Sequence, residues 1–342
     1  MATADCLLPM EPSMTTYNDE SPPIAMPTAP PLEPFDASKD LCFSPPSKTY
    51  TMTDISLPAD IGVSPLAVSE PFPLFTPAAV KRMRDEVLSP AVFNNCQYSS
   101  NIAMCQLRGY ADKYTPFIYD AWKSPVLLKH ISLVAGIDLT LQFDLEIGHI
   151  NLSYTPDQEG KEVTPTDADA DIPIVGWHRD SYPFVCVVML SDATNMVGGE
   201  TALRTGTGEI LKIKSPQMGH ALVLQGRYIE HQALRALGTT ERITMVTSFR
   251  PRSAKIRDDS VLRTVRPISD LGELYYQYMK YRLEMLEDRI REQLREFVAD
   301  KGGGRKIPTS KIKAFLEEQE DFIRRTNGEI VPDDQVVVGE LH

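Results

Sequence analysis

Residues 175–190, VGWHRDSYPFVCVVML, contain the feature that decides how this sequence is interpreted. His178 and Asp180 stand one residue apart, directly before an apolar run that is typical of a buried strand. Side chains at positions i and i+2 of a strand point to the same face, so we expect these two groups to converge while Arg179 points away. An imidazole nitrogen and a carboxylate oxygen together suit a divalent metal, which needs a third protein ligand to be held firmly.

Short β-type segments follow one another from Gly136 to about residue 250. They are TLQFDLEIGHINLSY, IVGWHRD, PFVCVVML, EILKI, HALVLQ and RITMVTSF, and Gly, Asn, Asp or Pro clusters separate most of them. No helical pattern lies between these segments. Their order therefore predicts an antiparallel sandwich or barrel rather than a parallel α/β sheet.

Helices are predicted both before and after these strands in the sequence. Thr76 and Pro77 suit an N-cap and a first helical position, Pro90 ends that run, and a second helix is expected over 115–135 with a boundary near Pro125. Further on, apolar residues recur in steps of three and four and form one stripe, which either packs on its own domain or forms a dimer seam. The residues of this stripe are Leu271, Tyr275, Met279, Leu283, Leu286, Ile290, Leu294 and Phe297.

The composition divides the chain into three parts. Its 342 residues are 42% hydrophobic and 24% charged, as in an ordinary soluble globular protein. Residues 1–48 hold ten of the 27 prolines, so we expect a disordered tail, with a polyproline ligand as the alternative. We predict a domain of lead-in helices and strands over 49–255 and a helical C-terminal extension over 256–342. The acidic insert 156–173 is expected to be a mobile loop.

Charge and cysteine usage narrow the partners and the compartment. A net charge of −12 has the wrong sign for phosphate backbones or anionic lipid, so we expect a small-molecule partner and neither nucleic acid nor a membrane. The five cysteines are scattered and never in CxxC spacing, which argues against a disulfide framework and a thiolate zinc site. The sequence contains no signal-like segment and no long apolar run, so a cytoplasmic protein is the expectation.

The third metal ligand has to come from the remaining histidines. His231 lies 53 positions after His178, beyond several predicted strands, where an inward-facing side chain can meet the first pair. His220 is the competitor, but it stands at a strand start and is interpreted as a strand-entry residue. His149 and His130 are interpreted as structural, in a strand and in a helix.

Three ligands on one side of an octahedral metal leave three positions open, which is the arrangement that non-haem Fe(II) oxygenases use. An acidic cosubstrate bound there also needs a cation for its distant carboxylate. Arg242 lies 11 positions after His231, and Thr244 shares its strand face. A guanidinium gives a bidentate, charge-assisted clamp on a carboxylate, and the hydroxyl adds another donor.

These motifs form an ordered set along the chain. The set consists of His178-x-Asp180, GGETAL at 198–203, Gly219-x-Ala221, His231 and Arg242-x-Thr244. It resembles the iron ligands, the adjoining segments and the cosubstrate anchor of the Fe(II)/2-oxoglutarate-dependent oxygenases, over about residues 76–255. The resemblance implies an α+β fold with a double-stranded β-helix (jelly-roll) core. It also implies Fe(II), 2-oxoglutarate and O2, with release of succinate and CO2.

The same resemblance leaves the substrate open. The chain looks most similar to fungal enzymes of secondary metabolism, some of which oxidise amino acids or peptide-derived natural products. Hydroxylation, desaturation and ring closure such as aziridine formation all use the same ligands, so the motif does not separate them. Asn151, Ser153, Tyr182 and Phe184 are expected to line the substrate pocket, and the candidates for a second cation near the iron are Arg204 and Arg250.

Two other classes of protein use parts of this pattern. A zinc-dependent hydrolase can have the same three ligands and a bound water, but it has no use for Arg242-x-Thr244 as a cosubstrate clamp. A non-catalytic β-barrel scaffold would act through the proline-rich tail and the helical stripe, and it would not need the metal ligands. The sequence His-Arg-Asp also opens a kinase catalytic loop, but no DFG segment accompanies it here.

Overall fold

The computed structural model describes residues 33–340 except Ile102, 155–171, Asn195, Ser215, 238–240 and Arg305. Residues 1–32 of the predicted tail lie outside the described residues. Residues 156–171 of the predicted acidic loop lie outside them too.

The chain packs against the core well before residue 49. The short helix α1 (Ala37–Asp40) lies in this region. The Phe35 ring meets Phe117 with 5.7 Å between ring centroids, and Phe43 stacks on His130 at 4.0 Å. The predicted end of the tail at residue 48 is therefore too late, because aromatic side chains between the prolines find partners on the lead-in helices. The division between residues 255 and 256 stays a prediction.

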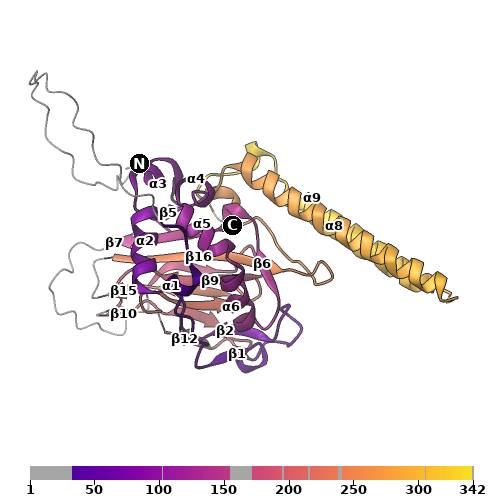
Figure 1. Cartoon of the computed structure of the whole chain (residues 1–342), viewed down its shortest axis with the longest axis horizontal. Coiled ribbons are helices and arrows are strands. Elements are labelled where there is room, and N and C mark those ends of the chain that lie inside the picture. Colours follow the sequence, from indigo (N-terminus) through magenta and orange to yellow (C-terminus); the bar gives the residue numbers. More distant parts are fainter. Residues whose placement is uncertain are drawn as a thin grey trace, which may run out of the picture. The chain divides into compact units, whose positions relative to one another are not determined.

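A ten-stranded antiparallel sheet forms the centre of the fold (Figure 1). Its strands are β1 (Thr49–Thr51), β2 (Leu66–Ser69), β3 (Phe72–Pro73), β4 (Gln97–Tyr98), β5 (Gln106–Leu107), β6 (Leu139–Leu141), β7 (His149–Tyr154), β9 (Phe184–Met189), β13 (His220–Leu224) and β16 (Glu241–Pro251). The main path runs β1-β2-β13-β9-β16-β7-β5-β4, while β3 pairs with β13 and β6 pairs with β16.

A smaller antiparallel sheet carries the remaining long strands. Its strands are β8 (Pro173–His178), β11 (Thr201–Arg204), β12 (Ile210–Ile213) and β14 (His231–Leu234), and a separate pair consists of β10 (Val197–Gly198) and β15 (Ala236–Leu237). The order in this sheet is β12-β11-β14-β8. From β7 on, the chain alternates between the two sheets, because β9, β13 and β16 belong to the larger one, and only β11 and β12 follow each other within the smaller one. The prediction of helices around antiparallel sheets is confirmed.

The N-terminal helices begin at the predicted caps. α2 (Pro77–Val87) follows Thr76, whose hydroxyl accepts a hydrogen bond from the N–H of Ala79. Pro90 does more than end that run, because it also opens α3 (Pro90–Cys96). A proline fits there since a first-turn N–H has no partner within the helix.

The predicted helix over 115–135 consists of two helices, α5 (Pro116–Lys123) and α6 (Pro125–Ala135), which meet at the expected boundary. Figure 1 shows them across the strands of the larger sheet. Trp122 anchors α5 there, since it is fully buried and its indole N–H lies 3.3 Å from the sulfur of Met245 on β16. The lead-in helices therefore cover one face of the sheet.

Two long helices follow the strands, α8 (Leu271–Gly302) and α9 (Thr309–Glu329). They lie side by side (Figure 1). Arg282 joins them, because its Nε donates to Thr326 Oγ1 at 2.8 Å and its guanidinium lies 3.6 Å from the centre of the Phe322 ring.

No residue of the predicted apolar stripe is fully buried, but Leu271, Tyr275, Met279 and Leu286 are half-buried against an apolar cluster. The buried α8 residues, which share an apolar cluster with Phe143, Leu145 and Tyr182, are Leu274, Tyr278, Tyr281 and Met285. Further along, Leu283, Ile290 and Leu294 are 57%, 50% and 61% exposed. The interpretation that the stripe packs on its own domain therefore holds only near the start of α8.

Short elements complete the described structure: η1 (Thr53–Ile55), α4 (Ala111–Tyr114), η2 (Asp144–Glu146), η4 (Arg266–Ile268) and η5 (Asp333–Gln335). Within the described ranges, no helix combines the length and the apolar character that crossing a bilayer requires.

Candidate active site

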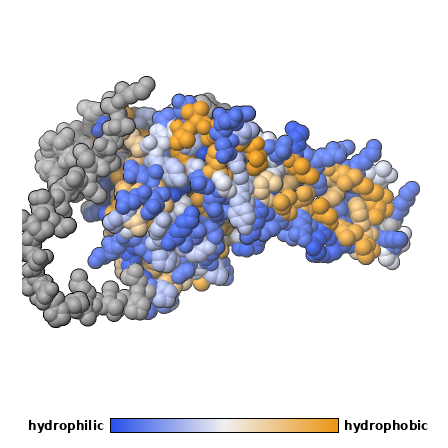
Figure 2. Space-filling model, turned by 90° about the horizontal axis from the view of Figure 1, so that it is seen from above, coloured by the Kyte–Doolittle hydropathy of each residue, from blue (hydrophilic) through white to orange (hydrophobic). Residues whose placement is uncertain are grey.

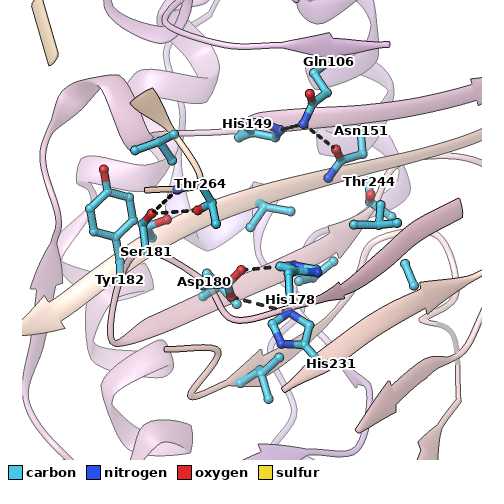
Figure 3. Close-up of a pocket in the computed structure, with 18 of the residues that line it drawn as sticks. Gln106, His149, Asn151, His178, Asp180, Ser181, Tyr182, His231, Thr244 and Thr264 are labelled. Carbon is cyan, nitrogen blue, oxygen red and sulfur yellow. Dashed lines mark hydrogen bonds and ion pairs between the residues drawn. The ribbon is translucent and has the colours of Figure 1, made fainter. Parts of the chain in front are cut away.

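Two histidines from neighbouring strands of the smaller sheet face each other. β8 ends at His178, β14 begins at His231, and the antiparallel register pairs these two residues directly. Their ring centroids lie 4.3 Å apart. Asp180 follows β8, and its two oxygens lie 3.4 Å from His178 Nε2 and 3.7 Å from His231 Nε2 (Figure 3).

These three side chains can each offer one ligand atom to a shared metal ion. The three atoms lie within 4.8 Å of one another, so these side chains could hold one metal ion. The structure thus brings together the three predicted ligands. Asp180 was predicted to lie on the same strand as His178. It follows the strand instead, because β8 ends at His178. Its N–H donates to the Gly226 carbonyl at 3.0 Å, and this contact turns the carboxylate back towards the histidines.

Both imidazoles are held in the tautomer that metal binding needs. The Nδ1 atoms of His178 and His231 lie 2.7 Å and 3.0 Å from the carbonyl oxygens of Gly176 and Ile229. A carbonyl can only accept, so each Nδ1 carries a hydrogen, and in the neutral imidazole the lone pair is therefore on Nε2, the atom on the side of Asp180. Contacts of this kind orient metal-binding histidines and raise their basicity.

Burial and mutual contact set the charges of the three groups. Burial lowers the pKa of His231. Burial also acts to lower the pKa of His178, but the neighbouring Asp180 outweighs it, so the pKa of His178 is raised. Burial also opposes ionisation of Asp180, but the two histidines outweigh it and lower the pKa of the carboxyl. Asp180 Oδ2 is buried and has no hydrogen-bond partner among the described groups. An ionised, unsatisfied carboxylate oxygen is suited to a cation.

Gly226 makes room for this carboxylate. A Cβ atom at Gly226 would lie 1.8 Å from Asp180 Oδ2 and 2.6 Å from its Cγ. Both distances are far below van der Waals contact. Gly226 therefore positions Asp180 in two ways, through its carbonyl and through the absence of a side chain.

A buried arginine lines the same cavity from the larger sheet. Arg242 of β16 is 6% exposed, its Nη2 donates to the Gly199 carbonyl at 3.4 Å, and its Nε has no partner among the described groups. Burial lowers the pKa of Arg242 to about 10, so the guanidinium stays charged at neutral pH. Thr244 is buried and lines the same cavity (Figure 3). The cavity thus has a cation and a hydroxyl where the sequence predicts a cosubstrate anchor.

The lining groups fit Fe(II) together with an acidic cosubstrate. Two neutral nitrogens and one carboxylate oxygen are the donor set of facial iron sites. No described carboxylate lies within ion-pair distance of Arg242. A buried charge is costly unless it is paired, and the carboxylate of a bound ligand would supply the partner.

Two of the predicted substrate residues, Asn151 and Tyr182, line the cavity. Phe184 does not, and this prediction was wrong. Val185 and Val187 of β9 face the cavity, so the period-two alternation of the strand turns Phe184 to the opposite face, where it is fully buried in the core.

The two arginines predicted as second cations lie outside the cavity. Arg204 is partly exposed and forms an ion pair with Glu230 at 3.1 Å. Arg250 shares a strand face with Arg242, but eight residues place it about 26 Å further along β16. There it lies over the ring of Tyr281 at 4.9 Å, in a different pocket.

β7 contributes His149 and Asn151 to the cavity, whereas Ser153 lies outside the lining. His149, predicted as purely structural, faces the cavity with its Nε2 3.1 Å from Gln106 Nε2 (Figure 3). Burial lowers the pKa of His149 to about 3, so this imidazole is neutral at neutral pH. His220 stands at the start of β13, as predicted, and is not part of the lining.

A buried charged network in the cavity wall was missed by the sequence reasoning. Arg108 donates to Glu146 with both terminal nitrogens, one of them at 2.8 Å, and its Nε donates to Ser269 Oγ at 2.8 Å. The hydroxyl of Tyr182 donates to the same carboxylate at 2.6 Å. Arg108 is therefore neutralised by Glu146. Both residues come from or next to elements of two or three residues, too short for any periodicity to mark them.

No protein-family model matches the sequence, and no curated protein matches it. Similar solved structures include a 2OG-Fe(II) oxygenase family oxidoreductase from Burkholderia pseudomallei, with 14% identity, a TM-score of 0.35, and coverage of 50% of this chain and 76% of that chain. A prolyl-4-hydroxylase from Pseudomonas putida has 14% identity, a TM-score of 0.32 and coverage of 52% and 88%. The alpha-ketoglutarate-dependent epimerase SnoN from nogalamycin biosynthesis has 15% identity, a TM-score of 0.32 and coverage of 52% and 85%.

The chain thus has 2OG-Fe(II) oxygenases among its structural neighbours. The identities are 14–15% and the TM-scores are below 0.5, so these similarities do not assign a function to this chain. The functional inference below rests on the side chains of the cavity.

Proposed function

We propose that this protein is a non-haem iron, 2-oxoglutarate-dependent oxygenase that oxidises a C–H bond of a small molecule and releases succinate and CO2. One observation carries the proposal. The cavity in which His178, Asp180 and His231 converge is also lined by Arg242, a buried cation without a described carboxylate partner. A metal-binding end and an anion-binding end in one cavity match a ligand that chelates a metal and extends a second carboxylate away from it.

The metal would be held by His178 Nε2, His231 Nε2 and a carboxylate oxygen of Asp180. When bound, Fe(II) supplies the dioxygen chemistry, and three protein ligands leave open positions for a cosubstrate and O2. The protein's own contribution is to keep both imidazoles neutral at Nε2, to keep Asp180 ionised and to limit access of water. The backbone carbonyls of Gly176 and Ile229 and the glycine at 226 serve these purposes.

Arg242 is proposed to bind the distal carboxylate of 2-oxoglutarate, with the hydroxyl of Thr244 as a further donor. The guanidinium is buried and charged, and its Nε is unsatisfied among the described groups. Because water is largely excluded, a carboxylate that reaches Arg242 gains a charge-assisted contact worth more than one at the surface.

The fold supports the same proposal. Eight strands run between the larger sheet (β7, β9, β13 and β16) and the smaller sheet (β8, β11, β12 and β14), and they alternate along the chain except that β11 and β12 follow each other in the smaller sheet. We interpret this alternation as the double-stranded β-helix that the sequence resemblance implies. In such an arrangement the end of β8 and the start of β14 adjoin, as the metal ligands require.

The substrate is proposed to bind by hydrogen bonds rather than to a second arginine. Among the described lining residues the cations are Arg108, which Glu146 neutralises, and Arg242, which is assigned to the cosubstrate. Polar groups without a net charge line the wall near the histidines, and they are Gln106, His149, Asn151, Ser181 and Thr264. An amino acid or peptide-derived natural product, oxidised by hydroxylation, desaturation or ring closure, stays the prediction for the substrate class, as does a role in secondary metabolism.

Anaerobic titration with Fe(II) and 2-oxoglutarate tests the proposed function. The chelate should give a weak metal-to-ligand absorption band in the visible range. Absence of the band together with Zn²⁺-dependent hydrolysis of esters or amides would favour the hydrolase. Absence of any metal binding would favour the scaffold.

Arg242→Ala provides the test of the cosubstrate site. Loss of one charge-assisted contact, about 1.5–3 kcal/mol, should weaken 2-oxoglutarate binding about 10–150-fold while Fe(II) binding persists. Arg204→Ala is the matched control, because Arg204 is partly exposed, pairs with Glu230 and does not line the cavity. Equal 2-oxoglutarate affinity in the two variants would refute the assignment of Arg242.

A further inference from the structure

A second pocket lies where the first turns of α8 pack beside β6 and the end of β16. Its volume is about 450 Å³, and it shares no lining residue with the cavity of the metal ligands. Arg250, predicted from the sequence as a second cation near the iron, lines this pocket instead, and we call it the Arg250 pocket. Beyond it, apolar surface runs along the helices past the sheets (Figure 2). The Arg250 pocket thus belongs to the part of α8 that packs on the sheet.

Arg250 is a cation without a described partner. Its guanidinium lies over the ring of Tyr281 at 4.9 Å, and its Nε is buried and makes no hydrogen bond with a described group. Among the described residues, no carboxylate oxygen lies within 4.0 Å of its nitrogens. An arginine stays protonated in a protein, and a buried cationic nitrogen without an acceptor is costly. An anion bound in the pocket would supply the acceptor.

The other charged residues of the Arg250 pocket do not neutralise Arg250. Lys123 and Asp144 pair with each other at 2.8 Å. Lys280 and Glu284 stand four residues apart on α8, and both are exposed. The described lining thus has three cations and two carboxylates, and neither carboxylate pairs with Arg250. The balance of charge favours a small anion over a small cation.

Gln142 adds an unsatisfied acceptor beside Arg250. Its N–H donates to the Ser248 carbonyl at 2.9 Å, so it continues the pairing of β6 with β16, in which Thr140 lies opposite Arg250. Gln142 is therefore the diagonal neighbour of Arg250 on the same face, about 7–8 Å away and within reach of a long side chain. Gln142 is 1% exposed, its Nε2 donates to Ser260 Oγ at 3.3 Å, and its Oε1 has no described partner. This oxygen needs a hydrogen-bond donor.

These two unsatisfied groups specify the ligand. Arg250 calls for a carboxylate, and Gln142 calls for a donor close to it. A neutral hydroxyl suits this donor better than an ammonium group, because Arg250 and Lys280 would repel a positive charge. The half-buried Leu128 and the buried Phe143 also line the pocket and suit an apolar body.

We propose that the Arg250 pocket binds a small hydroxy acid with an apolar body, whose carboxylate contacts Arg250 and whose hydroxyl donates to Gln142 Oε1. This site goes beyond the proposed function, since it involves none of the metal ligands. It borders the metal-binding cavity, because the ring of Phe143 lies 5.8 Å from Tyr281 of the pocket and 5.6 Å from Tyr182 of the cavity.

Three related compounds test the site by calorimetry on the whole chain, without metal and in the presence of EDTA. Mandelate carries both groups, phenylacetate lacks the hydroxyl, and 1-phenyl-1,2-ethanediol lacks the carboxylate. Mandelate should bind about 2–10-fold more tightly than phenylacetate and at least about 10-fold more tightly than the diol, as one neutral and one charge-assisted hydrogen bond imply. A dissociation constant for mandelate above about 10 mM would overturn the proposal, and so would equal affinities for mandelate and phenylacetate.

Variants assign the two contacts. Arg250→Gln should weaken mandelate binding at least about 10-fold, and Arg250→Lys, which keeps the charge, should retain part of the affinity. Gln142→Leu should abolish the preference for mandelate and leave the affinity for phenylacetate unchanged. Arg252→Gln is the matched control, because Arg252 is exposed, pairs with Asp138 at 3.1 Å and does not line the pocket. Thermal melting checks that each variant is folded.

Arg242→Ala separates the Arg250 pocket from the proposed cosubstrate site. Mandelate is a carboxylate too, so binding at Arg242 is the competing result. Loss of mandelate binding in Arg242→Ala with full binding in Arg250→Gln would show that the proposal is wrong. The reverse pattern would support the Arg250 pocket, whether or not the protein binds Fe(II) and 2-oxoglutarate.

Discussion

Replacing Gly226 with alanine should remove the metal site without unfolding the protein. The added carbon would lie 1.8 Å from Asp180 Oδ2, and contacts under 3.0 Å essentially do not occur, so Oδ2 must move by at least 1.2 Å (3.0 − 1.8). Metal–ligand distances tolerate deviations of only about 0.2 Å. Asp180 therefore cannot keep its place in the site.

The expected loss of metal affinity is large. Removing only an orienting contact typically costs about 10–100-fold in metal affinity. Gly226→Ala displaces a ligand itself, so we expect at least about a 100-fold increase in the dissociation constant for Fe(II), measured anaerobically by calorimetry. The visible band with 2-oxoglutarate should disappear at metal concentrations that saturate the wild type.

Gly176→Ala is the matched control for this experiment. Gly176 stands two positions before His178, a proposed metal ligand, yet a Cβ atom there meets no described atom within 4 Å, and its carbonyl is retained. Thermal melting without metal should be similar for both variants. Gly226→Ala protein that binds Fe(II) as tightly as Gly176→Ala would refute the placement of Asp180 as a ligand.

Two further predictions concern buried charge. Glu146→Gln removes the neutralising partner of Arg108 and should lower the free energy of unfolding by about 3–5 kcal/mol in urea titrations, whereas a loss below 1 kcal/mol would contradict a buried ion pair. His149 has a pKa of about 3 in the folded protein against 6.5 in the unfolded chain, so the unfolded state takes up the proton first as the pH falls. Stability should therefore drop by on the order of 1–2 kcal/mol between pH 7 and pH 5, and His149→Gln should show a smaller drop; equal drops would exclude His149 as the cause.

The three proposed metal ligands were within reach of sequence reasoning because their convergence follows from short-range geometry. His178 and Asp180 are close in the chain whatever the exact strand end, and the antiparallel register then selects His231 as the histidine opposite them. The error about Asp180, which lies after the strand rather than on it, did not change the outcome. The turn after β8 and the contact with Gly226 bring the carboxylate to the same place.

The rest of the cavity lining was harder to predict because it depends on distance along strands and on very short elements. Even spacing correctly put Arg250 on the strand face of Arg242, but it gave no account of the length of β16. Phe184 was assigned to the wrong face because the start of β9 was not fixed by the pattern. Arg108 and Glu146 meet only through tertiary packing of β5 and η2, and no local rule connects residues 38 positions apart.

The C-terminal extension has a consequence for anyone who wants a smaller version of this protein. Thr264, Val265 and Ile268 lie beyond residue 255, yet they line the cavity. The start of α8 also packs in one apolar cluster with Tyr182, two positions after Asp180. Truncation at the end of the last strand would therefore open the cavity to water, and a shortened protein that keeps the cavity closed has to continue at least as far as Met285.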